Sequence, residues 1–169
     1  GLQSTQVPSI GTAQLAALTT DQLAAFTSDN IAALTTTQVA VLSSSQMGTI
    51  DATELGSFTT DEIVLLTPKS LTGLTTAALS GLSTDNLAAF TTTQIAGLSA
   101  VQIGSITSDQ MAVLKTDQVV ALTTAQLSAL STDTLAGLKT DQVAVLTTKQ
   151  VSTLSATQLG SFNSDNIVA

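Results

Sequence analysis

The sequence predicts an all-α fold, a solenoid or superhelical rod of about 21 very short capped helices, one per octapeptide, with no β-sheet. A large apolar residue recurs at every eighth position from Leu2 to Phe162, and a second apolar register runs from Val7 to Ile167. Ser, Thr and Gln recur at fixed places between these registers. Strict self-similarity of this kind indicates short units that bury their apolar residues against neighbouring units.

Each octapeptide, called an octad below, has the pattern of a helix start. In the octad from Thr19 to Phe26, Thr19 is expected as the N-cap and Gln22 as residue N3, the two members of a capping box. Leu18 precedes the cap at N′ and pairs with Leu23 at N4 as a hydrophobic staple. Fifteen of the 21 cap positions are Ser or Thr, and fifteen of the 21 N3 positions are Gln or Glu. The clearest capping pairs are Thr19 with Gln22, Thr35 with Gln38, Thr91 with Gln94 and Thr123 with Gln126.

The helices must be short and must follow one another in order along the chain. One continuous helix would rotate the apolar pair by about 80° per octad, so no partner could cover it. A strand would place Leu23 and Phe26 on opposite faces, because they are three residues apart. We therefore expect helices of about six or seven residues, each ended by the next Ser or Thr cap. Pro68 falls at N1, a helical position that suits proline.

Neighbouring octads must stack, since helices this short are unstable alone. The small residues after N4, such as Ala24 and Ala25, let helix backbones approach closely. The Gln register could instead form side-chain ladders between stacked octads, or drive β-aggregation in segments such as residues 35–42, but the capping geometry favours the folded helix. The two apolar registers supply the core. Its expected members are Leu18, Leu23, Phe26, Ile31, Leu34, Val39, Leu42, Leu87, Phe90, Ile95, Leu98, Ile103, Leu122, Leu127, Leu146 and Val151.

Residues 1–169 read as one continuous octad array, which we expect to be a fragment of a longer protein. A longer period of seven octads is visible as well. The octads 43–50, 99–106 and 155–162 are alike, which suggests super-repeats at 1–56, 57–112 and 113–168. Either duplication or the pitch of a superhelix would produce that period.

Composition argues against most chemical functions. The formal charge is −8 with four basic residues, 2% aromatics and no His, Cys, Trp or Tyr. Nucleic acid is an improbable partner, because phosphate binding needs Lys and Arg clusters. We expect no enzymatic activity, no catalytic or metal-binding residues, no cofactor and no small-molecule substrate. Nine aspartates at N2 could be calcium ligands, but one carboxylate per octad favours a helix-dipole role. No apolar run is long enough for a membrane span.

The octads ending at Leu42 and Leu130 carry a recognisable consensus, Leu-Thr-Thr-x-Gln-aliphatic-x-x-Leu. It resembles the octapeptide arrays of long, repetitive bacterial exoproteins of the adhesin or haemagglutinin-like type. The resemblance implies a secreted or surface-displayed structural region and no catalytic residues. The Gly-Gly-x-Gly-x-Asp calcium nonapeptide of many such exoproteins is absent.

We therefore expect a non-catalytic stalk or filament region of a bacterial extracellular or cell-surface protein, serving adhesion, biofilm or fibre architecture. Such arrays would associate with their own kind, end to end or laterally. The alternative is a binding module, either a solenoid scaffold for protein partners or an ice-binding face. That face would use the threonines at N1, such as Thr20, Thr36 and Thr92.

Overall fold

The computed structural model describes residues 1–162, and all regular structure in that range is helical. Every octad in the range forms one helix. The first is a 3₁₀-helix and the others are α-helices: η1 Ser4–Ser9, α1 Thr12–Ala16, α2 Thr20–Ala24, α3 Ser28–Ala32, α4 Thr36–Val39, α5 Ser44–Met47, α6 Ala52–Gly56, α7 Thr60–Leu65, α8 Pro68–Leu71, α9 Thr76–Ser80, α10 Thr84–Ala88, α11 Thr92–Gly97, α12 Ala100–Ile103, α13 Ser108–Ala112, α14 Thr116–Ala121, α15 Thr124–Ser128, α16 Thr132–Ala136, α17 Thr140–Ala144, α18 Thr148–Val151 and α19 Ala156–Leu159. None of these helices is long and apolar enough to cross a membrane, for the residues that are described.

The α-helices span four to six residues, which is shorter than the sequence suggested. Helix α4 shows why. Its cap Thr35 is extended, and the Gln38 backbone N–H donates to Thr35 Oγ1 at 3.4 Å. At the other end the Leu42 N–H donates to the Val39 carbonyl three residues back, at 3.2 Å. This tight bond closes the helix before the N′ residue, so only the middle of each octad is regular α-helix.

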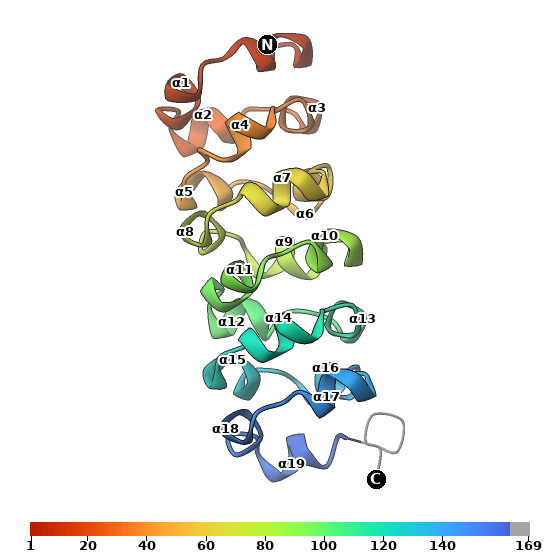
Figure 1. Ribbon diagram of the computed structural model, residues 1–169. Coiled ribbons are helices and arrows are strands. Elements are labelled where there is room, and N and C mark those ends of the chain that lie inside the picture. Colours follow the sequence, from red (N-terminus) through yellow and green to blue (C-terminus); the bar gives the residue numbers. More distant parts are fainter. Residues whose placement is uncertain (163–169) are drawn as a thin grey trace.

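The helices stack into an elongated array with the N-terminus and helix α19 at opposite ends (Figure 1). Helices three octads apart pack against one another throughout the described residues. Thus α5 packs on α8, α8 on α11, and α11 on α14, which places them one below another in Figure 1. This repeated neighbour contact is the defining feature of a solenoid.

The core is a continuous line of aliphatic side chains along the array. From Leu15 to Leu135 every N4 residue is almost completely buried, and from Leu34 to Leu138 so is every N′ residue. Cap, N1 and N2 residues face outward or are only partly covered. In residues 1–162 burial is thus confined to N3, N4 and N′, and N3 is polar at all but one of the buried N3 sites.

Candidate functional site

The N3 glutamine amide connects successive turns of the superhelix. In α11, Gln94 Oε1 accepts from the Thr91 backbone N–H at 2.7 Å, as a capping box requires. The nitrogen of the same amide, Nε2, donates to the carbonyl oxygens of Ile63 and Leu66, both at 2.7 Å. Those carbonyls lie 31 and 28 residues earlier in the chain. One buried side chain therefore caps its own helix and holds the preceding turn.

The same bond recurs along the described chain at a constant spacing of 28 residues. We call these bonds the amide ladder and each one a rung. Thirteen N3 residues form rungs: Asn30, Gln38, Gln46, Asn86, Gln94, Gln102, Gln110, Gln118, Gln126, Thr134, Gln142, Gln150 and Gln158. Thr134 substitutes a hydroxyl, which donates to the Ile106 carbonyl at 3.1 Å. The ladder supplies a donor to the N′ carbonyls, which would otherwise be buried between turns without a hydrogen-bond partner.

The rung spacing gives the geometry of the superhelix. Twenty-eight residues are three and a half octads, so one superhelical turn contains about that number. Each octad consequently lies over the junction between two octads of the preceding turn. This explains why helices pack three octads away, while Nε2 also reaches the N4 carbonyl 31 residues back. A 56-residue period would correspond to two such turns; the super-repeats at 1–56, 57–112 and 113–168 stay a prediction.

All four capping pairs singled out from the sequence form both bonds of the capping box in the structure. Among the expected core residues, twelve are buried: Leu23, Ile31, Leu34, Val39, Leu42, Leu87, Phe90, Ile95, Leu98, Ile103, Leu122 and Leu127. Leu18, Phe26 and Leu146 are half-buried. Val151 is 38% exposed, so its placement in the core was wrong. These four residues lie near the ends of the described array, where a turn packs on only one side.

From the sequence, ladders of the Gln side chains between stacked octads were an alternative to capping. That one amide does both, with backbone carbonyls 28 residues away as its acceptors, was not predicted. A capping box needs only a side-chain oxygen at N3, which Glu supplies as well as Gln. Yet N3 holds Gln thirteen times and Glu only at Glu54 and Glu62. That preference indicates that the amide nitrogen also donates a hydrogen bond, since both the oxygen and the nitrogen of a buried amide are expected to have hydrogen-bond partners.

Successive turns also approach closely at small residues. A Cβ atom on Gly137, at N6, would lie 2.6 Å from the Ser108 carbonyl oxygen, and Ser108 is an N1 residue three octads earlier. Gly97 at N6 meets Pro68 at N1 in the same way. The N1 row is thus partly covered by the following turn. Thr20 and Thr36 are exposed, whereas Thr92 is half-buried, and the ice-binding alternative stays a prediction.

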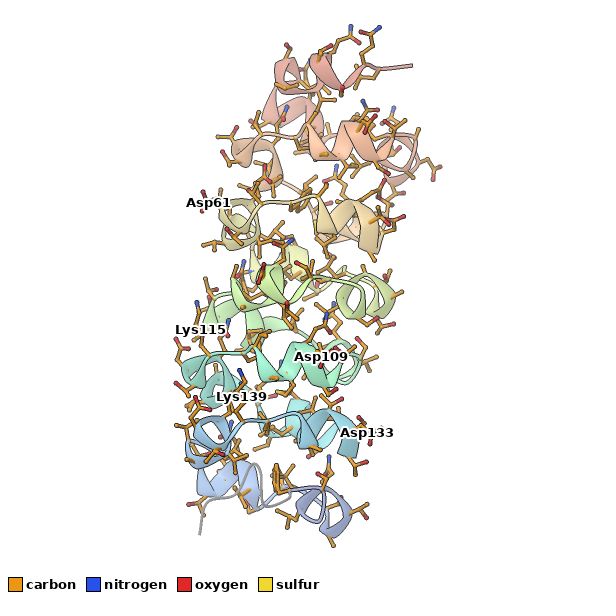
Figure 2. The ribbon with its side chains drawn as sticks, turned by 90° about the vertical axis from the view of Figure 1, so that its right-hand side faces the viewer. Asp61, Asp109, Lys115, Asp133 and Lys139 are labelled. Carbon is orange, nitrogen blue, oxygen red and sulfur yellow. The ribbon has the colours of Figure 1, made fainter. Side chains whose placement is uncertain are left out.

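The outer surface carries the charge of the molecule. Every N2 aspartate of the described residues is exposed. Asp61, Asp109 and Asp133 lie on the outside of the array, and Asp61 and Asp133 on different sides of it (Figure 2). Within residues 1–162, His, Cys, Asp and Glu side chains form no group of three that could hold a metal ion. The conspicuous polar feature is therefore the ladder inside the array.

Comparison with known proteins agrees with this architecture. A search of curated proteins finds no match. The sequence model of a family described as the ALTTAQ repeat matches three times, at residues 68–100, 96–124 and 119–156. Together these matches cover 68–156, more than half of the 169-residue chain. They confirm that this is a tandem-repeat region, and the chain belongs to the ALTTAQ repeat family.

Proposed function

We propose that the chain is a non-catalytic structural array, a stalk or filament-forming region of a bacterial extracellular or cell-surface protein. The observation that supports this most directly is the amide ladder, which repeats one turn-to-turn contact along most of the array. A fold in which octads pack on those of the preceding turn can extend over a long distance by adding further octads. The resemblance of the octads to bacterial adhesin-type arrays supports the surface location, and the absence of Cys is compatible with it.

We further propose that arrays associate end to end through the contact that joins their turns. Gln14 and Gln22 at the N-terminal end are exposed, and their amide nitrogens make no rung among the described residues. At the opposite end the N4 residues Val151 and Leu159 are 38% and 41% exposed. No described group donates to the N′ carbonyls of Leu146 and Leu154 at this end. Donors on one face thus match carbonyls and aliphatic side chains on the other, a head-to-tail geometry that produces filaments. An octad that continues the array at either end, in the same register, would contact the same two faces.

The test is sedimentation velocity of the 169-residue chain over a concentration series, with electron microscopy of the same samples. We expect the sedimentation coefficient to rise with concentration and thin filaments to form. Gln14→Glu with Gln22→Glu should weaken association, because a carboxylate keeps the capping oxygen but removes the donor. Thr5→Glu with Ala13→Glu is the control, since it adds the same charge at exposed N2 positions.

Two outcomes would contradict the proposal. If only isolated short rods were seen at every concentration, the arrays would not associate end to end. Equal loss of association in the Gln and control variants would show that charge alone, and no rung, governs it.

A further inference from the structure

Between its first and last described rungs, at Asn30 and Gln158, the amide ladder is interrupted once, over four consecutive octads. Their N3 residues are Glu54, Glu62, Ser70 and Ala78. Glu54 and Glu62 only accept within their own octads, from the Asp51 and Thr59 N–H groups at 3.1 and 2.8 Å. Ser70 Oγ donates to the Thr67 carbonyl of its own octad at 2.8 Å, and Ala78 has no polar side-chain atom. None of the four reaches the preceding turn.

The interruption has the length of a whole superhelical turn. Rungs follow every eight residues and a turn contains about 28, so four missing rungs leave one turn boundary without any. The intact rungs on either side are those of Gln46 and Asn86. We call the boundary between residues 23–50 and residues 51–82 the seam. By the ladder spacing, the N′ carbonyls facing it are those of Phe26, Leu34, Leu42 and Ile50, and no described side chain donates to them.

The seam is held by apolar packing and one close backbone contact. The N4 side chains Leu55, Ile63, Leu71 and Leu79 are buried there. A Cβ on Gly73 would overlap the Ser44 carbonyl oxygen, more closely than at any other glycine of the described residues. Apolar burial has no direction, whereas hydrogen bonds fix the relative position of the groups they join. Two turns joined without rungs can therefore tilt or separate at a lower cost than their neighbours.

We propose that the seam is a built-in opening point, at which the array bends and separates before any other internal turn boundary. The Gly73–Ser44 contact is its pivot. The carboxylates of Glu54 and Glu62 keep the seam weak, because each has the shape of the glutamine that would close it but lacks the donor. This concerns the opening of the array itself and goes beyond its structural role.

Native-state hydrogen exchange of the 169-residue chain tests the proposal. Residues 24–50 should exchange at least about tenfold faster than residues 113–139, which lie at a comparable distance from the other end of the described array. Equal protection of the two segments would overturn the proposal, since chain-end fraying affects both.

Two isosteric substitutions then assign the cause. Glu54→Gln with Glu62→Gln should add two rungs, slow exchange in residues 24–50 and leave residues 113–139 unchanged. The converse pair, Gln94→Glu with Gln102→Glu, should open a second seam and speed exchange in residues 63–74, whose carbonyls lose their donors. Thr93→Glu with Val101→Glu is the matched control, because it adds the same charge at exposed N2 positions of the same two octads. If the Glu→Gln pair left exchange at the seam unchanged, or the N2 control sped exchange in residues 63–74 as much as the Gln→Glu pair, the ladder would not govern opening.

Discussion

At the scale of single residues, side chains at the same position of the octad differ in exposure along the array. Leu127 and Leu159 both occupy N4, and they are 0% and 41% exposed. The difference arises because a following turn packs over Leu127, whereas none of the described residues does so over Leu159. Burial is thus a property of a residue's place in the stack as much as of its type.

This contrast gives the first prediction. Leu127→Ala should lower the free energy of unfolding by about 2 to 5 kcal/mol, because it leaves a cavity in the core. Leu159→Ala should lower it by less than about 1 kcal/mol, which is usual for a substitution at a partly exposed position. Urea unfolding followed by circular dichroism measures both. Similar costs for the two variants would mean that turn stacking does not bury the N4 register.

At the scale of the element, each helix depends on its cap for a defined start. In α15 the Gln126 N–H donates to Thr123 Oγ1 at 3.2 Å. In α14 the cap is Lys115, whose side chain makes no capping bond, and the Gln118 N–H donates to Asp117 Oδ1 at 2.9 Å instead. An N2 aspartate can therefore replace the cap hydroxyl.

The second prediction follows from these two helices. Thr123→Ala should cost about 1 kcal/mol of stability, because the Gln126 N–H loses its acceptor. Lys115→Ala should change stability by less than about 0.5 kcal/mol, since no capping bond is lost. Thermal unfolding of the two variants beside the parent chain provides the measurement. A larger effect of Lys115→Ala would contradict the interpretation that the Lys115 side chain has no part in starting α14.

At the scale of the whole molecule, octads are equivalent units related by one screw operation. Each meets the same kinds of neighbour at spacings of 24, 28 and 31 residues. Removal of one whole octad shifts every later octad into the place of its predecessor. Removal of half an octad places the wrong residue type in every contact that crosses the deletion.

The third prediction compares two deletions in α11. Loss of residues 91–98 should leave mean residue helicity unchanged and the unfolding midpoint close to that of the parent chain. Loss of residues 91–94 should reduce helicity and lower the midpoint, because the N3 and N4 registers no longer align across the cut. Circular dichroism with thermal unfolding distinguishes these outcomes. Equal tolerance of both deletions would contradict a fixed 28-residue register.

The sequence by itself determined the helical unit, its cap, and the all-α solenoid class. Those features depend on interactions within eight residues, such as Thr35 with Gln38, which the chain spells out directly. That the chain has no catalytic activity and binds no nucleic acid stays a prediction from composition, made because the residue types that those functions need are scarce or absent.

Only the tertiary structure decided the three and a half octads per turn, the second task of the N3 amide, and the seam. These depend on which octads meet across 28 residues, and an octad repeat is compatible with many such numbers. Gln94 and Glu62 cap equally well, so local reasoning cannot separate them. They differ only when the carbonyls of the preceding turn lie against the side chain, because there a donor is required and an acceptor is not.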